Sequence, residues 1–211
     1  MSAALVIAVR GGPLAKSRCA AVLGRRDRQA LVAAMLEDML EAARDIGTVT
    51  VITPTLELAD LAADHGARTL LEHEPFGLNA AFAAGMRSQA PGAPVLLLPG
   101  DLPLVGAEDL AEAIQAVEAG AIVLASSRAD GGTGAIGLPP GVELPLMFGP
   151  DSFRRHLAAA RTAGRPLRVI DSGPLGLDID RPQDLERLRQ APATRSAAVL
   201  RRALVPLEAT A

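Results

Sequence analysis

The feature that most constrains the fold of this chain is a regular alternation of short apolar runs with longer amphipathic stretches. The first run, residues 3–9, has the length of a strand buried on both faces and ends in the loop-forming cluster Arg10-Gly11-Gly12-Pro13. After it, Asp27 is expected to cap a helix whose apolar face includes Leu31, Met35, Met39 and Ala43. The same alternation predicts strands at residues 48–53, 67–71, 95–98, 121–125, 135–138 and 167–170, and helices at 56–64, 77–87, 107–119, 152–163 and 182–189.

Strands that alternate with helices of this length favour a mostly parallel sheet with helices on both faces. We therefore predict an α/β protein, a three-layer α/β/α sandwich with a mostly parallel mixed sheet. Residues 1–190 are expected to form one domain, followed by an Ala- and Arg-rich tail, residues 191–211, that could add one more helix. In such folds ligands bind beyond the carboxyl ends of the strands, so the loops at that edge are the place to look for a site.

The composition excludes several classes of binding partner and of structural site. The chain has no Trp or Tyr and a net charge of −3, so it lacks both the aromatic platform and the basic surface that nucleic-acid binding requires. Its single cysteine, Cys19, rules out an intramolecular disulfide framework and a zinc site built from cysteines. No apolar run reaches the ~18 residues of a membrane span. The sequence thus favours a cytoplasmic globular protein with no nucleic-acid or membrane partner.

The loop of residues 10–18 combines two glycines with three cations. Gly11 and Gly12 let backbone N–H groups approach a phosphate, and Lys16 supplies a compact ammonium that arginine cannot mimic. Lys16 is also the only lysine in the chain, which suggests that this ammonium is needed. The loop matches neither the G-x-x-x-x-G-K-[ST] nor the G-x-G-x-x-G motif, so a solvated basic turn is the alternative interpretation.

Carboxylates follow two separate predicted strands. Asp101 comes after the strand at residues 95–98, and Asp178 and Asp180 follow a later one. Magnesium takes only one or two protein carboxylates and completes its coordination with water and substrate phosphates, so these residues could hold it. A turn residue at Asp101 and a helix cap at Asp180 are the alternatives. All three carboxylates and the loop at residues 10–18 lie after strands and could converge on one crevice.

Two further loops are small and carry hydroxyl groups. Residues 131–134 read Gly-Gly-Thr-Gly, and residues 148–152 open a predicted helix whose N-terminal amides could hold an anion. An ordinary helix cap at Asp151 or Ser152 is the alternative. His156, four residues into that helix, is expected at the surface.

In this order, the motifs resemble those of the guanylyltransferases of coenzyme F-420 biosynthesis, which act on 2-phospho-L-lactate or phosphoenolpyruvate. The resemblance covers residues 1 to about 190 and includes the only lysine and the only asparagine of the chain. The matching stretches are Ala15-Lys16-Ser17-Arg18, Gly77-Leu78-Asn79, Asp101-Leu102-Pro103, Gly131-Gly132-Thr133, Phe148-Gly149-Pro150-Asp151-Ser152-Phe153 with His156, and Asp178-Ile179-Asp180 with Pro182, Asp184 and Leu185.

The resemblance implies a fold like that of sugar-nucleotide and molybdopterin nucleotidyltransferases, and it implies a role for each motif. Residues implied in GTP binding are Arg10, Gly11, Gly12, Lys16, Asn79 and Pro99; for Asn79 a helix-start cap is the alternative. Lys16, Arg18 and Asp101 are implied in catalysis, and Asp101, Asp178 and Asp180 in holding Mg²⁺. Thr133, Gly149 and Ser152 match positions that receive the acidic groups of the substrate. Two positions depart from relatives, many of which have Lys at Arg10 and some Asn at Gly134.

The implied reaction joins GMP from GTP to a phosphorylated three-carbon acid and releases pyrophosphate. The acid would be phosphoenolpyruvate or 2-phospho-L-lactate, with 3-phospho-D-glycerate ranked behind them. A phosphate has a second pKa of about 6, so the attacking oxygen is already ionised and no general base is required. The product would pass to a downstream transferase, and the apolar tail makes a homodimer plausible. A glycosyltransferase that uses a nucleotide sugar, or a non-catalytic nucleotide-binding module, is the alternative.

Overall fold

The computed structural model describes residues 3–74, 76–127, 131–171, 173–191 and 194–204. In these ranges seven strands form one sheet in the order β3-β2-β1-β4-β6-β5-β7. The strands are β1 (Ala4–Ala8), β2 (Thr48–Thr53), β3 (Arg68–Leu71), β4 (Val95–Pro99), β5 (Ile122–Ser126), β6 (Thr133–Leu138) and β7 (Leu167–Ile170). Neighbouring strands run parallel except that β6 is antiparallel to both β4 and β5. The predicted α/β class with a mostly parallel mixed sheet is confirmed.

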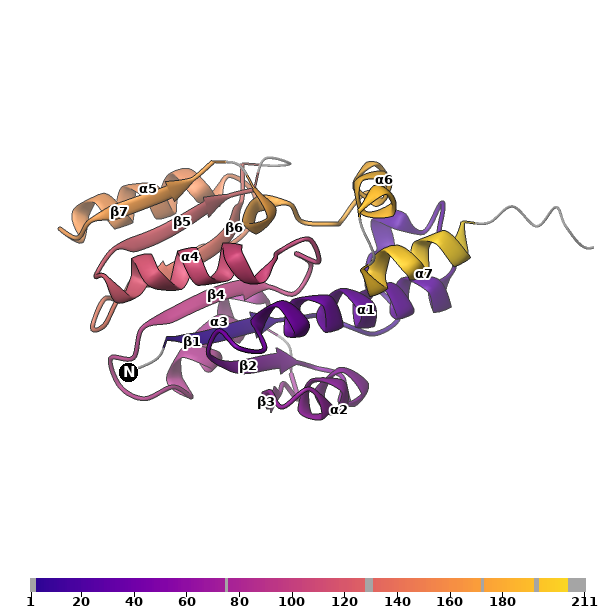
Figure 1. Ribbon diagram of the computed structural model, residues 1–211, viewed down its shortest axis with the longest axis horizontal. Coiled ribbons are helices and arrows are strands. Elements are labelled where there is room, and N and C mark those ends of the chain that lie inside the picture. The colour runs from indigo at the N-terminus through magenta and orange to yellow at the C-terminus, as the bar shows by residue number, and fades with distance from the viewer. Residues whose placement is uncertain (1–2, 75, 128–130, 172, 192–193, 205–211) are drawn as a thin grey trace, which may run out of the picture.

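Helices cover both faces of this sheet and complete three layers (Figure 1). One face carries α1 (Arg25–Ala43), α2 (Leu56–Asp64), α4 (Ala107–Glu118), α6 (Pro182–Gln190) and α7 (Arg195–Ala203). The other face carries α3 (Leu78–Arg87) and α5 (Ser152–Thr162). Two 3-10 turns, η1 (Ser17–Cys19) and η2 (Pro174–Gly176), lie in the loops that follow β1 and β7.

The first strand shows why an uninterrupted apolar run was needed. Side chains of a strand alternate between its two faces, and both faces of β1 are covered. Leu5 and Ile7 belong to the core under α1 and α4, whereas Val6 belongs to the core under α3 and α5. All three side chains are fully buried. Burial of such a side chain contributes roughly 1.5–3 kcal/mol, so β1 anchors both layers.

The ends of β1 and β4 place two loops side by side. Ala8 pairs with Pro99 in the parallel register, and the N–H of Gly100 donates to the carbonyl of Ala8 at 2.8 Å. A Cβ atom at Gly100 would lie 2.5 Å from the Cβ of Val9, so only glycine lets the two backbones approach so closely. As a result, the loops that follow β1 and β4 begin side by side at the carboxyl edge of the sheet.

The beginning of α1 differs from the expectation. The helix begins at Arg25 with Gly24 as its N-cap, so Asp27 does not cap it. Asp27 instead lies in the first turn, where a carboxylate interacts favourably with the positive end of the helix dipole.

The tail after residue 190 contains α7, which packs along α1 (Figure 1). Asp38 of α1 accepts the backbone N–H groups of Arg195 and Ser196 at 2.8 and 3.0 Å, and Thr194 caps the same helix end by accepting from Ala197 at 3.1 Å. Residues 205–211 of the tail lie outside the described residues, as do 128–130 of the Gly-rich loop. None of the described helices is long and apolar enough to cross a membrane.

Candidate functional site

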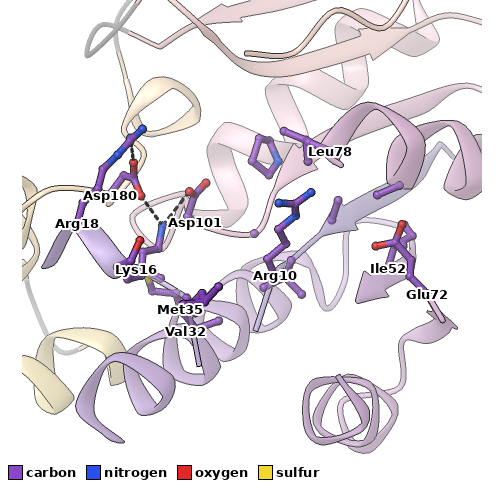
Figure 2. A pocket seen from close by; sticks show the side chains of 18 residues that line it. Arg10, Lys16, Arg18, Val32, Met35, Ile52, Glu72, Leu78, Asp101 and Asp180 are labelled. Atoms are coloured by element: carbon purple, nitrogen blue, oxygen red, sulfur yellow. Dashed lines mark hydrogen bonds and ion pairs between the residues drawn. The ribbon is translucent and has the colours of Figure 1, made fainter. Parts of the chain in front are cut away.

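A cleft of about 550 Å³ opens at the carboxyl edge of the sheet (Figure 2). Its walls come from the loops that follow β1 and β4, from the start of α3 and from the inner face of α1. Lining residues that carry charge are Arg10, Lys16, Arg18, Glu72, Asp101 and Asp180. Segments far apart in the sequence therefore meet at the edge where this fold class binds ligands.

Lys16 lies at the centre of the charged end of the cleft. Its side chain is only 9% exposed, and its Nζ donates to Oδ2 of Asp101 at 2.9 Å and lies 3.8 Å from Oδ1 of Asp180. Burial by itself would lower the pKa of this ammonium, but the nearby charges of Asp101, Asp180 and Asp178 outweigh burial and raise the pKa. The ammonium is therefore fully charged at neutral pH.

Asp180 is held as part of this cluster and does not cap α6. Arg18 donates to Oδ2 of Asp180 beside the contact with Lys16 (Figure 2). The N-cap of α6 is Arg181, and Oδ2 of Asp184 accepts the N–H groups of Arg181 and Asp180 at 2.8 and 3.1 Å. Because Asp184 satisfies the helix start, the carboxylate of Asp180 is available to the cleft.

Two further contacts fix the acidic residues relative to one another. The N–H of Ile179 donates to the carbonyl of Asp101 at 3.0 Å, which joins the loops after β4 and η2. Asp178 accepts from Oγ of Ser127 at 2.9 Å and contributes to the field that Lys16 experiences. Ser127 was not expected in the site, although it follows directly after β5 and so carries the same strand-end signal as Asp101.

The donor set fits a divalent cation only in part. Oδ1 of Asp101 is buried and has no hydrogen-bond partner among the described residues, and an orphaned carboxylate oxygen is a ligand that Mg²⁺ prefers. Yet within the described ranges no three His, Cys, Asp or Glu side chains are arranged to hold a metal ion. The ammonium of Lys16 lies among these carboxylates instead. Because Mg²⁺ needs few protein ligands, the residues fit the ion once this ammonium moves.

Arg10 points into the other half of the cleft, between Leu78 and Glu72 (Figure 2). Its side chain is exposed, and no ion pair joins it to another described residue. Burial raises the pKa of the Glu72 carboxyl, while the charge of Arg10 opposes that rise. Next to Arg10, a Cβ atom at Gly11 would lie 2.8 Å from Thr55, so the loop needs glycine to pass the start of α2. The cleft thus offers a free guanidinium to an anion.

Asn79 lies one residue beyond the cleft wall and makes two backbone contacts. Its Nδ2 donates to the carbonyl of Phe148 at 3.2 Å, and its Oδ1 accepts the Phe148 N–H at 2.7 Å. It is not a cap, because Gly77 holds that position for α3 without a side-chain bond. In the structure Asn79 therefore holds the loop at residues 148–152, and it faces a second cavity of about 730 Å³.

Thr133, Ser152 and His156 form a buried hydrogen-bonded chain behind that loop. The N–H of Met147 donates to Nε2 of His156 at 2.9 Å, so Nδ1 carries the ring proton and donates to Oγ1 of Thr133 at 2.8 Å. Oγ1 of Thr133 lies 3.0 Å from Oγ of Ser152 and completes the chain. The structure thus brings together two of the three residues implied in acid binding.

The expectation that His156 is a surface residue was wrong. Its side chain is fully buried and packs edge-on against Phe148, with ring centroids 5.2 Å apart. Burial, with a smaller contribution from the charge of Arg155, lowers the pKa of His156 to about 4. The ring is therefore neutral at pH 7, which the Met147 N–H on Nε2 also requires. No local pattern signals this, because the partner Thr133 lies 23 residues away.

Glycines give the loops at residues 131–134 and 148–152 their shape. Gly149 has a φ of 138°, and Asp151, the N-cap of α5, adopts a left-handed φ of 53° without a side-chain cap bond. At Gly134 a Cβ atom would lie 2.1 Å from the carbonyl oxygen of Leu175. A side chain at this position is thus incompatible with this arrangement of η2.

Comparisons with known proteins agree with this geometry. The family model described as "Guanylyl transferase CofC like" matches residues 3–204. A 3-phospho-D-glycerate guanylyltransferase of Phenylobacterium zucineum is 43% identical over 92% of both chains. A phosphoenolpyruvate guanylyltransferase of Sphaerobacter thermophilus is 38% identical over 89% of this chain and 93% of its own. The structure of a putative nucleotide-diphospho-sugar transferase from Desulfovibrio desulfuricans matches with a TM-score of 0.77 at 18% identity, over 96% of this chain and 95% of that one.

Proposed function

Because the chain belongs to the guanylyl transferase family, we propose that it joins the GMP moiety of GTP to a phosphorylated three-carbon acid and releases pyrophosphate. The observation that carries this proposal is the cleft itself, in which Lys16 and Arg18 contact carboxylates at one end and Arg10 extends into the other half. Cations beside carboxylates suit a triphosphate and its metal ion.

In the proposed reaction a phosphate oxygen of the acid attacks the α-phosphorus of GTP. The new P–O bond forms as the bond between the α-phosphorus and the oxygen bridging to the β-phosphate breaks, and pyrophosphate leaves with that electron pair. The attacking oxygen is ionised at neutral pH, so the protein need only position two anions and neutralise their charge. The resulting phosphoanhydride is an activated acid, which a downstream transferase would consume.

Each charged residue then has a task. Arg10 and the backbone of Gly11 and Gly12 would bind the triphosphate, and Lys16 with Arg18 would stabilise charge that develops on the leaving pyrophosphate. Mg²⁺, held by Asp101, Asp178 and Asp180, would neutralise phosphate oxygens when bound.

The acid would bind near the start of α5. Thr133 and Ser152 lie in the buried chain with His156, and Asn79 holds the loop that contains Gly149. This arrangement fixes the loop, which favours a small ligand of defined shape. We expect 3-phospho-D-glycerate to react fastest, because the relative named for that acid is 43% identical and the relative named for phosphoenolpyruvate is 38% identical. The sequence motifs had placed 3-phospho-D-glycerate behind phosphoenolpyruvate and 2-phospho-L-lactate, so this expectation reverses that order.

The test is pyrophosphate release from GTP and Mg²⁺ with 3-phospho-D-glycerate, phosphoenolpyruvate and 2-phospho-L-lactate in turn, with ATP and CTP as nucleotide controls. We expect release with one acid to exceed release with the others by at least about tenfold, a difference a pocket readily produces. No release with any acid, from folded protein that binds GTP, would contradict guanylyl transfer. Release of a nucleoside diphosphate from a nucleotide sugar would point to the glycosyltransferase reaction.

A further inference from the structure

The proposed function gives Lys16 a task that its position in this structure does not allow. Stabilising the leaving pyrophosphate requires the ammonium to face the nucleotide. In the structure it instead faces Asp101 and Asp180, at 2.9 and 3.8 Å. The same carboxylates are the ones expected to hold Mg²⁺. Lys16 and a metal ion therefore compete for one position.

The local structure suits a side chain with two stable positions. Lys16 has a left-handed backbone, with φ at 49°, which costs a non-glycine residue about 1 kcal/mol or more. Its side chain is 9% exposed, yet Oδ1 of Asp101, on the carboxylate that it contacts, is buried without a partner. One ammonium thus satisfies only part of the acidic cluster.

We infer that, without metal, the Lys16 ammonium occupies the cation position between Asp101 and Asp180, and that a divalent cation displaces it toward the phosphates of the bound nucleotide. This inference rests on the proposed function for the destination of Lys16, but the displacement depends only on the carboxylate cluster.

The exchange follows from the balance of charge in the cluster. The carboxylates of Asp101 and Asp180 contact the two cations Lys16 and Arg18, and removal of Lys16 alone would leave partly buried negative charge uncompensated. A divalent cation supplies twice the charge and can also use the orphaned Oδ1 of Asp101. The displaced ammonium then needs a new anion, which the nucleotide provides. Metal binding and nucleotide binding should consequently strengthen each other. The metal ion frees the Lys16 ammonium for the phosphates, and the nucleotide gives that ammonium a new anionic partner.

The first test measures Mn²⁺ binding by electron paramagnetic resonance, with neither GTP nor acid present. Lys16→Met removes the competing charge and keeps most of the side-chain volume, so we expect Mn²⁺ to bind about tenfold tighter or more than to the wild type. Turnover should fall in the same variant. The matched control is Arg168→Met, which removes the cation paired with Glu112 near the β7 edge of the sheet and should leave Mn²⁺ affinity unchanged. Equal or weaker Mn²⁺ binding by folded Lys16→Met would overturn the inference.

The second test uses the wild-type chain and does not depend on the folding of a variant. Because Lys16 is the only lysine, acetylation by an amine-reactive ester can be followed on one peptide by mass spectrometry, with an added lysine peptide as the internal reference. We expect Mg²⁺ alone to speed acetylation of Lys16 at least about threefold, because the side chain leaves the carboxylates. Addition of a non-hydrolysable GTP analogue should slow it again. Acetylation that Mg²⁺ leaves unchanged or slows would overturn the displacement.

These measurements separate the two proposals. Tighter Mn²⁺ binding by Lys16→Met and faster acetylation with Mg²⁺ would support the displacement even if no acid accepts GMP from GTP. Conversely, guanylyl transfer in the wild type with neither effect would leave the proposed function standing and overturn this inference.

Discussion

The acidic cluster around Lys16 and the hydrogen-bonded chain around His156 differ in charge, in burial and in completeness. The first is partly open to solvent, joins the carboxylates of Asp101 and Asp180 to two cations, and leaves Oδ1 of Asp101 without a partner among the described residues. The second is neutral, and both ring nitrogens of His156 are hydrogen-bonded. An incomplete charged cluster can exchange partners with a ligand, whereas a satisfied neutral one fixes geometry. The contacts around Lys16 can therefore change when a ligand binds, whereas the contacts around His156 keep their geometry.

The largest expected effect is on catalysis at the charged cluster. Asp101→Asn keeps the shape of the side chain and can still accept from Lys16, but it removes the negative charge that a metal ion needs. We expect pyrophosphate release to fall about 10²–10³-fold, while the free energy of unfolding changes by about 1 kcal/mol or less. Steady-state kinetics and urea unfolding measure the two quantities. A loss of turnover below tenfold would remove Asp101 from the catalytic set.

The next largest effect is on stability, at the hydrogen-bonded residues Thr133, Ser152 and His156. His156→Ala leaves the Met147 N–H and the Thr133 hydroxyl without their ring partner and opens a cavity beside Phe148. We expect the free energy of unfolding to fall by about 3 kcal/mol, with GTP affinity unchanged. His65→Ala is the matched control, since His65 makes one bond to the Leu61 carbonyl at the edge of α2, and it should cost about 0.5 kcal/mol. Similar losses in both variants would contradict the distinction between the clusters.

The smallest effect concerns pH. The pKa of His156 lies at about 4 in the folded chain and near its ordinary 6.5 in the unfolded chain. Between these values the unfolded chain binds more protons, so stability should fall by at most about 1.4 kcal/mol per pH unit as pH drops from 6.5 toward 4, and by about 3 kcal/mol in total. Urea unfolding at several pH values measures the slope. A variant without the imidazole, His156→Asn, should have a smaller slope, and an identical slope would assign the effect to other groups.

Much of the fold and of the charged cluster could be predicted because the signals are local. Each strand is a short apolar run, and Asp101 follows its strand directly, so the parallel topology suffices to bring it to the edge where Lys16 lies. Deviations were confined to element ends, as at Arg25, where α1 begins ahead of its expected cap.

The hydrogen bonds around His156 could not be predicted, because they join residues that are far apart in the sequence and share no motif. His156 finds Thr133 across 23 residues, and Asn79 finds Phe148 across 69. The Ala- and Arg-rich sequence around this histidine does not indicate that its side chain is buried. Its environment depends on how α5 packs against β6 and on the loop that precedes α5, which are tertiary features. The residues proposed to hold Mg²⁺ posed a further difficulty, since no sequence rule shows that Lys16 lies between Asp101 and Asp180.

The contact between Arg18 and Asp180 joins residues 162 positions apart, and it has a consequence for the order in which the protein matures. The loop at residues 10–18 is synthesised before any of the sheet after β1, whereas its acidic partner Asp180 is added only after β7. The helix that packs on α1 from the tail comes later still, and α1 supplies Val32 and Met35 to the floor of the cleft. A nascent chain therefore carries the loop long before it carries a complete site, and the cleft cannot be finished until the residues after β7 have been synthesised.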